Sequence, residues 1–150
     1  MAQYLSASRA LTGDGKTVLC PAWIGFEGKT ITYVSTEKPA DATAENTTIL
    51  PQTVTLTPGL LNIHDHISRK SLRFPKPGKT FGQCATELMS NSQEYLILHS
   101  YVNMLSYLQD EGITYVRDMG LTGYTCIDLR KAINEGLLKG PYISACGMSL

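Results

Sequence analysis

The chain has 150 residues, of which 43% are hydrophobic, so it contains enough apolar side chains to form the core of one ordinary domain. Its 13 basic and 13 acidic residues balance. The sequence shows no basic stripe and no run of like charges that would bind nucleic acid or an anionic membrane surface. We therefore expect a small-molecule substrate, with neither nucleic acid nor membrane as a partner.

Cysteine usage and the N-terminal segment favour a soluble, cytoplasmic protein. The four cysteines are widely spaced and form no Cys-x-x-Cys pair: Cys20, Cys84, Cys126 and Cys146. Nothing next to Cys146 in the sequence predicts an activated thiol. The first twenty residues include Arg9, Asp14 and Lys16 and lack a continuous apolar segment, which predicts neither a signal peptide nor a transmembrane helix.

Residues 3–54 have a β-like pattern, in which turn residues separate short runs of β-branched and aromatic side chains. Residues 12–15 predict a turn and residues 18–26 predict a strand. A turn at 27–29 then leads into 30–34, whose alternation predicts the second strand of a hairpin. Trp23 and Tyr33 are interpreted as packing residues of this region rather than as a platform for a ligand.

The second half of this region is less regular. Residues 38–46 predict a loop, residues 48–50 and 54–56 predict two more strands, and Pro58-Gly59 predicts a closing turn. These short strands are too few for a closed sandwich, so we expect the first ~55 residues to belong to a sheet that is completed elsewhere.

Two histidines follow the next apolar run, Leu60-Leu61-Asn62-Ile63, which predicts a short buried strand. Side chains two positions apart in a strand point to the same side, so His64 and His66 can present two imidazoles to one cation, with Asp65 facing the other way. Neutral imidazole is a common zinc ligand. The alternative is a hydrogen-bonded, inert pair, but the position at the end of a strand favours a ligand site.

The segment 67–84 is rich in Arg, Lys, Pro and Gly and predicts a long loop at the histidine end of the strand. Its cations Arg69, Lys70 and Arg73 could contact an anionic group there. The other interpretation, which this composition favours, is a basic loop exposed to solvent.

The clearest predicted helix begins at a capping-box-like sequence, residues 91–94, and continues to Gly112. The apolar positions expected to face inward are Ile97, Tyr101, Met104, Leu105 and Leu108. His99 lies near the edge of this stripe and is interpreted as a surface or packing residue, separate from the histidine pair.

A strand at 113–116 follows the helix and ends in Arg117-Asp118, which gives a βαβ unit of parallel strands. Arg117 and Asp118 either face the mouth of a site or, as we favour, form a structural ion pair. A second helix capped within 125–128 runs to 134 or 135, with Ile127 and Ile133 inward and Gly136 as its stop. A third strand opens at 141–145.

Three stretches taken in order carry a resemblance to a known family: Thr57-Pro58-Gly59-Leu60-Leu61-Asn62-Ile63-His64-Asp65-His66, then 112–118, then 140–147. The sequence resembles the start of a metal-dependent amidohydrolase, in the branch of the imidazolonepropionases and the Xaa-Pro dipeptidase-like enzymes. The resemblance covers essentially the whole chain, and His-x-His after Pro-Gly-Leu is its most specific motif.

The resemblance implies an α/β protein in two parts. Residues 1–57 would be the N-terminal part of a small β-sandwich, and residues 58–150 would be the first part of a (β/α)8 TIM barrel, with about three strands. It also implies that His64 and His66 bind a divalent metal, zinc foremost, which activates water to hydrolyse an amide-type C–N bond.

The family's remaining metal ligands and its proton-transferring aspartate come from later strands, and 150 residues contain no matching positions. We therefore expect the chain to be inactive alone, with the rest of the barrel coming from further sequence or from another chain, and a homo-oligomer when complete. The alternatives are a non-catalytic binding or regulatory module, a split-enzyme subunit that needs a partner chain, and a self-contained α/β domain with a structural His-x-His.

Overall fold

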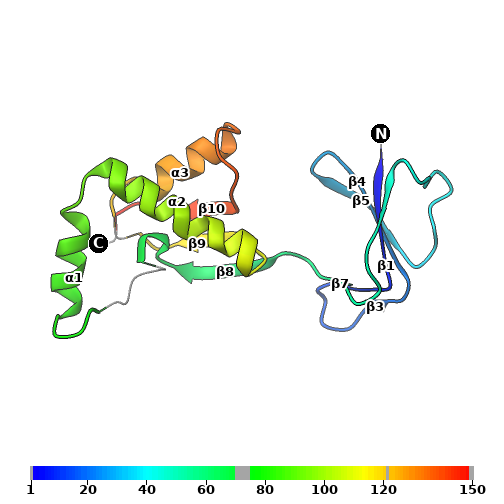
Figure 1. The fold of residues 1–150 in the computed structure, drawn as a ribbon, viewed down its shortest axis with the longest axis horizontal. Coiled ribbons are helices and arrows are strands. Elements are labelled where there is room, and N and C mark those ends of the chain that lie inside the picture. Colours follow the sequence, from blue (N-terminus) through cyan, green and yellow to red (C-terminus); the bar gives the residue numbers. More distant parts are fainter. Residues whose placement is uncertain (1, 70–74, 121, 149–150) are drawn as a thin grey trace. The chain divides into compact units, whose positions relative to one another are not determined.

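The computed structural model describes residues 2–69, 75–120 and 122–148. The chain divides into two compact units, Met1–Pro58 and Gly59–Leu150. Figure 1 shows the first unit built from strands and the second from strands and helices. The α/β class expected from the sequence is confirmed at this level, because the described residues contain several sheets and three α-helices.

The described residues of the first unit, 2–58, form seven short strands in two sheets. The strands are β1 (Gln3–Ala7), β2 (Arg9–Leu11), β3 (Val18–Leu19), β4 (Ala22–Glu27), β5 (Thr30–Ser35), β6 (Thr47–Ile49) and β7 (Thr55–Leu56). One sheet has the order β5-β4-β1-β6 and the other has the order β3-β2-β7. Strand β1 is antiparallel to β4 and parallel to β6, so segments far apart in sequence pair directly.

The predicted hairpin is confirmed. Strands β4 and β5 pair antiparallel, from Glu27↔Thr30 to Trp23↔Ser35, around a two-residue loop in which Gly28 has a φ of 57°. A positive φ is easy for glycine, and such loops match the twist of the strands they join. The single strand expected over 18–26 is wrong, because β3 and β4 are two strands that belong to different sheets. Pro21 lies between them and has no N–H to donate to a sheet.

The second unit is organised on one parallel sheet. Its elements are β8 (Leu60–Asp65), η1 (Ile67–Arg69), α1 (Phe81–Met89), α2 (Gln93–Asp110), β9 (Ile113–Asp118), α3 (Thr125–Asn134) and β10 (Tyr142–Ala145). The sheet order is β10-β9-β8 and both pairings are parallel, as the sequence predicted. Gly136, with a φ of 75°, follows the end of α3, which confirms the predicted helix stop.

The core of this unit lies between the sheet and the two longer helices. Its buried members come from η1, both helices and two strands: Ile67, Met104, Tyr107, Val116, Cys126, Leu129 and Ile143. The buried face of α2 overlaps the predicted stripe in part: Met104 is buried, and Ile97 and Tyr101 pack partly buried against the core. The other buried residues of the helix are Leu96, Ser100, Asn103 and Tyr107. Two of these are polar, which is why the apolar pattern placed the stripe about one position away.

Helix α1 was not expected, because its first half was assigned to the loop 67–84. Thr80 starts the helix: its hydroxyl accepts from the Gln83 N–H at 3.3 Å, and the Gln83 side chain accepts from the Thr80 N–H at 2.8 Å. This is a reciprocal capping box. The predicted box at 91–94 is wrong in detail, since Ser92 caps α2 alone while the Asn91 amide donates to two carbonyls at the end of α1.

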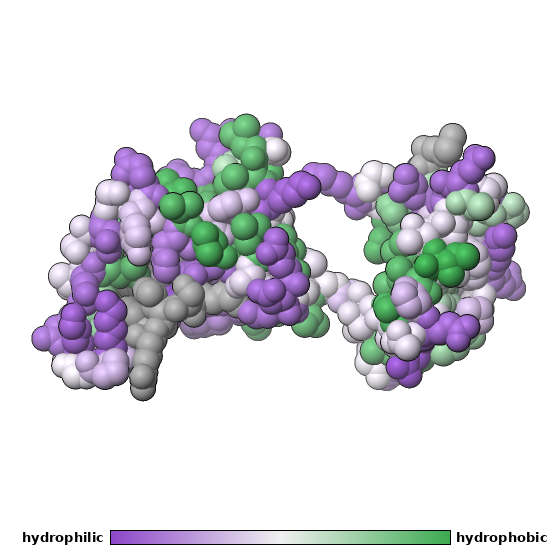
Figure 2. All heavy atoms as spheres, viewed as in Figure 1, coloured by the Kyte–Doolittle hydropathy of each residue, from purple (hydrophilic) through white to green (hydrophobic). Residues whose placement is uncertain are grey.

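Strand β8 is not buried, contrary to the prediction. It is an edge strand, and Leu61 and Ile63 are 66% and 68% exposed. Leu61 pairs with Tyr115, which pairs with Tyr142, so a row of apolar side chains crosses the face of the sheet away from the core. Figure 2 shows such apolar residues, in green, at the surface of each unit.

Gly59 packs against β9 rather than forming the turn expected at Pro58-Gly59. A Cβ at position 59 would lie 2.1 Å from the Thr114 hydroxyl oxygen, so only glycine lets the start of β8 approach β9 this closely. The bond from the Leu60 N–H to the Gly112 carbonyl, 3.0 Å long, marks the same close approach. No helix in the described part of the chain is long and apolar enough to cross a membrane.

Candidate metal centre

The histidine pair lies where β8 ends. His64 is the penultimate residue of the strand and is exposed, while His66 follows the strand directly and is half-buried. Their ring centroids lie 5.8 Å apart and the ring planes are inclined by 73°. The strand register against β9 shifts by one residue between Asn62 and Asp65, so the bulge includes Ile63 and His64.

This separation is suitable for sharing one cation. Zinc lies about 2.0–2.1 Å from a ligating imidazole nitrogen and takes tetrahedral geometry, which puts the centroids of two ligating rings about 5 Å apart. The two rings are therefore within a small side-chain adjustment of that arrangement. The donor set, two imidazoles, is also the chemistry that zinc and related divalent ions prefer.

A hydrogen bond fixes the tautomer of His66. Its Nδ1 lies 2.7 Å from the carbonyl oxygen of Gly120. A carbonyl oxygen only accepts, so Nδ1 carries the proton and, in the neutral ring, Nε2 is the nitrogen with a free lone pair. This arrangement, in which one ring nitrogen donates to the protein and the other is left bare, is typical of histidines that ligate metals.

The Asp65 carboxylate accepts three hydrogen bonds, one of them from α2. Oδ1 accepts from the His66 N–H at 2.6 Å, while Oδ2 accepts from the Asn62 amide at 2.5 Å and from the Tyr107 hydroxyl of α2. Burial is the main cause that raises the pKa of Tyr107, and its hydrogen bond to Asp65 raises that pKa further. Asp65 is therefore a support for the strand end rather than a further ligand.

Asp118 is buried at the end of β9, where its carboxylate accepts hydrogen bonds from backbone N–H groups instead of pairing with Arg117. Its oxygens accept from the N–H groups of Ile67 at 2.9 Å and of Gly120 at 3.1 Å. Burial raises its pKa, and those two hydrogen bonds oppose the rise. Arg117 is exposed on the opposite side of the strand, so the favoured Arg117–Asp118 ion pair is wrong: neighbouring strand residues point to opposite faces.

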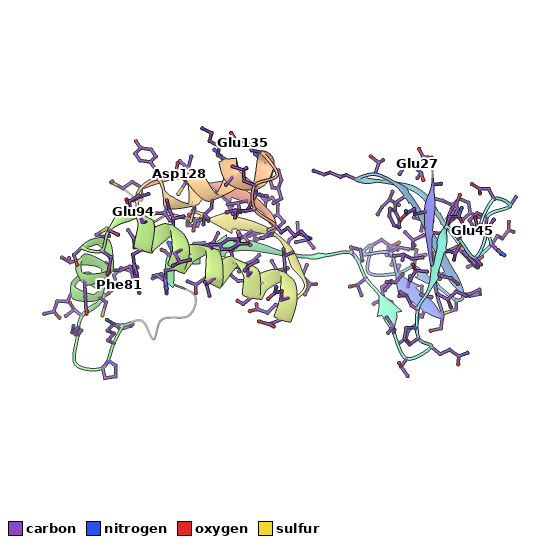
Figure 3. All side chains as sticks on the ribbon, turned by 45° about the horizontal axis from the view of Figure 1, so that its top comes forward. Glu27, Glu45, Phe81, Glu94, Asp128 and Glu135 are labelled. Atoms are coloured by element: carbon purple, nitrogen blue, oxygen red, sulfur yellow. The ribbon has the colours of Figure 1, made fainter. Side chains whose placement is uncertain are left out.

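The other singled-out residues lie apart from the pair. His99 stacks on Tyr95 within α2, with centroids 5.8 Å apart, and its Nε2 lies 3.3 Å from the Asn103 amide nitrogen, in agreement with a packing role. The Arg69 guanidinium lies over the ring of Phe81, 5.3 Å from its centroid, and Figure 3 labels Phe81 at the start of α1. Lys70 and Arg73 lie outside the described residues.

Within the described ranges, no group of three or more His, Cys, Asp or Glu side chains is placed to hold a metal ion. The histidine pair therefore supplies two ligands, and a complete site needs others. One surface depression, of about 580 Å³, lies along α1 and is lined by Lys79, Gly82, Gln83, Thr86 and Glu87. Lys79 and Glu87 form an exposed ion pair of 2.7 Å there, which gives the depression no evident chemistry.

Sequence reasoning missed the residues that support the pair. Asn62 and Tyr107 bind Asp65, and Gly120 binds the His66 ring. Only Gly120 carried a usable signal, since glycine after a strand often marks a special backbone conformation, here with a φ of 82°. Tyr107 lay off the predicted stripe of α2 and carried no such signal.

No protein-family model and no curated protein sequence matches the chain. Solved structures do match. A Xaa-Pro dipeptidase with methionine bound in its active site has a TM-score of 0.77 at 24% identity, covering 100% of this chain and 34% of that one. An amidohydrolase gives 0.76 at 22%, with coverages of 99% and 32%, and phenylurea hydrolase B gives 0.75 at 18%, with 99% and 31%.

These similarities establish the fold of the chain. The dipeptidase and the phenylurea hydrolase are hydrolases of C–N bonds, and the dipeptidase and the amidohydrolase carry the names of the predicted branch and family. The chain spans about a third of the length of each of them.

Proposed function

We propose that the chain is the N-terminal portion of a metal-dependent amidohydrolase that hydrolyses an amide-type C–N bond, with His64 and His66 as two ligands of a divalent ion, zinc foremost. The observation that carries the proposal is the orientation of the pair: two rings 5.8 Å apart, one with its tautomer set by the Gly120 carbonyl. The fold shared with C–N hydrolases supports the reaction class.

The architecture we propose follows from the same similarity. Strands β8, β9 and β10 would be the first three strands of a (β/α)8 barrel, and residues 1–57 would be part of a β-sandwich. The exposed apolar row on the sheet supports this, because a barrel would cover that face with further strands. Those strands would come from further sequence or from a second chain.

The residues of this chain would bind and orient the ion. His64 and His66 would each give one neutral imidazole nitrogen, and Asp65 would hold the strand end through its three donors. When bound, such an ion lowers the pKa of water and polarises a carbonyl. Because the Asp65 carboxylate already accepts three hydrogen bonds that hold the strand end, we assign it no proton transfer, and the proton-transferring group would come from outside the described residues.

Metal binding tests the proposal directly, and the chain offers a matched control in its third histidine. Zinc titration into the full chain, purified without a histidine tag, is expected to show one site on wild type and on His99→Ala. In His64→Ala and His66→Ala the affinity should fall at least about tenfold. Equal zinc affinity in all four proteins, or no divalent ion in the chain and any co-purifying partner, would contradict it.

The second candidate is a non-catalytic binding or regulatory module that keeps the front of the barrel. The lack of a third metal-ligating side chain among the described residues favours it. A panel of dipeptides and arylureas, incubated with the zinc-loaded chain and its co-purifying partner, separates the two candidates. Turnover that disappears in His66→Ala supports the hydrolase. Zinc binding without turnover in the fraction that contains the rest of the barrel supports the module.

A further inference from the structure

We propose that Asp118 is a positioning residue that fixes the His66 ring in the tautomer with Nε2 free. The proposal rests on the metal-binding role proposed for His66 and names the group that prepares it. Asp118 itself touches neither histidine ring through the hydrogen bonds of its carboxylate.

The Asp118 carboxylate joins two backbone segments that the sequence separates widely. It is 1% exposed, and each oxygen accepts one N–H: Oδ1 from Ile67 and Oδ2 from Gly120. Ile67 belongs to the short helix η1 after β8, and Gly120 follows β9. A buried carboxylate with both oxygens hydrogen-bonded is a rigid connection, because breaking either bond would leave a buried polar group unpaired.

Both segments end at His66. Ile67 is its immediate neighbour in the chain, and the Gly120 carbonyl accepts from its Nδ1 at 2.7 Å. The connections therefore close a ring that runs from Asp118 to Gly120, to the imidazole, along the backbone to Ile67 and back to Asp118. In such a ring the Asp118 bond to the Gly120 N–H holds the Gly120 Cα beside the imidazole, within reach of the carbonyl that accepts from Nδ1.

Other contacts hold the same segments and make Asp118 the remaining link. The Asn103 amide donates to the Ile67 carbonyl at 2.8 Å, so Ile67 is held on both its N–H and its C=O. The Met119 N–H donates to the Asp65 carbonyl at 2.6 Å, which ties the end of β9 to the end of β8. Neither contact reaches Gly120, whereas the Asp118 bond to the Gly120 N–H holds that residue next to the His66 ring.

A carboxylate is the side chain this position requires. Two N–H groups converge on it, and asparagine offers one oxygen together with an NH2 that would face a second N–H. Asp118→Asn therefore removes at least one of the two bonds at nearly constant volume. A purely structural role predicts lower stability alone, while a positioning role predicts a change in the His66 tautomer as well.

Nitrogen-15 NMR of the histidine rings in the metal-free full chain at about pH 8, where imidazole is neutral, reports the tautomer directly. Wild type is expected to show His66 protonated on Nδ1, and Asp118→Asn a mixture of the two tautomers. Zinc affinity should fall about 10- to 100-fold in the variant, as it does when other groups that orient a ligand are removed.

Two variants serve as controls. Asp128→Asn makes the same substitution at an exposed aspartate of α3, labelled in Figure 3, and should behave as wild type. Val116→Ala removes core volume next to the network and should lower the melting temperature without changing the His66 tautomer. Its melting temperature shows how much of any effect of Asp118→Asn is lost stability alone.

The outcomes separate this proposal from the metal proposal. A folded Asp118→Asn chain with His66 still protonated on Nδ1 and with wild-type zinc affinity would overturn the inference. If that variant does not fold, wild type decides: Nε2-protonated His66, or rapid exchange of the Ile67 and Gly120 amide hydrogens, would overturn it. If the chain binds no zinc but the His66 tautomer changes in Asp118→Asn as expected, only the metal-binding role of His66 is contradicted.

Discussion

Aspartate side chains in this protein act on the backbone around them. Asp14, Asp65 and Asp118 each accept backbone N–H groups, in a surface turn, at a strand end and between two strands respectively. Asp14 is the exposed case: Oδ1 accepts from the N–H groups of Lys16 and Thr17, and Oδ2 accepts from the Thr17 hydroxyl at 2.6 Å. These bonds close the bend at 13–16, which overlaps the predicted turn at 12–15.

The Asp14 turn predicts a pH-dependent stability of the first unit. The Thr17 hydroxyl and then the backbone N–H groups hold the pKa of Asp14 well below its ordinary value. Its ionised form therefore stabilises the unit above about pH 4, and this contribution is lost as the pH falls through the lower folded-state pKa. Asp14→Asn should lower the melting temperature at pH 7, and its difference from wild type should narrow below pH 4.

Trp23, the single tryptophan, lies in the first unit and makes its unfolding visible by fluorescence. Glu45→Gln, at an exposed glutamate of the same unit, is the control and should match wild type throughout. A difference between Asp14→Asn and wild type that stays constant from pH 7 to about pH 2 would show that the carboxylate charge has no part in the turn.

The sequence predicted the two histidines of the candidate centre, because their spacing and the strand period are local information. It drew attention to Asp118 but assigned it the wrong partner. The contacts that orient His66 join residues about 50 positions apart, such as His66 with Gly120. No local pattern encodes such a pairing; it depends on the register between β8 and β9, which includes a bulge.

At the scale of elements, α1 depends on its N-terminal cap more than on burial. Only Cys84, Ala85 and Leu88 of its nine residues are buried, and the Thr80–Gln83 box satisfies the first backbone donors. Thr80→Ala should cost the helix about 1 kcal/mol and increase hydrogen exchange within 81–89. Thr86→Ala, at an exposed position inside the same helix, should slow exchange slightly, because alanine is the better helix former.

Equal exchange rates in 81–89 for Thr80→Ala and wild type would show that packing alone maintains α1. An increase confined to 75–79 would mean that the cap orders the preceding turn instead of the helix.

Most elements of the fold were predicted where the local pattern was strong. The β4–β5 hairpin, helices α2 and α3, and the parallel order of β8, β9 and β10 were expected from turn residues and periodicity. Helix α1 was not predicted, because the prolines and glycine at 75–78 extend the expected loop over the capping signal Thr80-x-x-Gln83. The prediction that β8 is buried was wrong because an apolar run shows only that a strand is suited to burial. Whether its side chains are buried depends on the elements packed against it, and β8 is an edge strand.

At the scale of the whole molecule, each unit leaves apolar strand residues exposed to solvent. Ile31 and Ile49 are exposed in the first unit, and Leu61 and Ile63 in the second. Monomeric proteins rarely expose contiguous apolar surface of this kind without a partner for it. The second unit exposes the more continuous apolar surface, because the row of Leu61, Tyr115 and Tyr142 crosses three strands and ends at β8, an edge strand.

We expect the 150-residue chain alone to self-associate through this face, with a native mass above its 16.4 kDa at about 50 µM. Leu61→Lys combined with Ile63→Lys should shift the mass toward the monomer, because charges on the sheet face resist desolvation. Leu137→Lys, at a comparably exposed leucine (72%) beyond α3, is the control and should leave the association unchanged. Light scattering on a sizing column measures all three. A stable wild-type monomer at that concentration would contradict self-association through the exposed apolar row of the sheet. It would also count against the proposal that further strands cover this row.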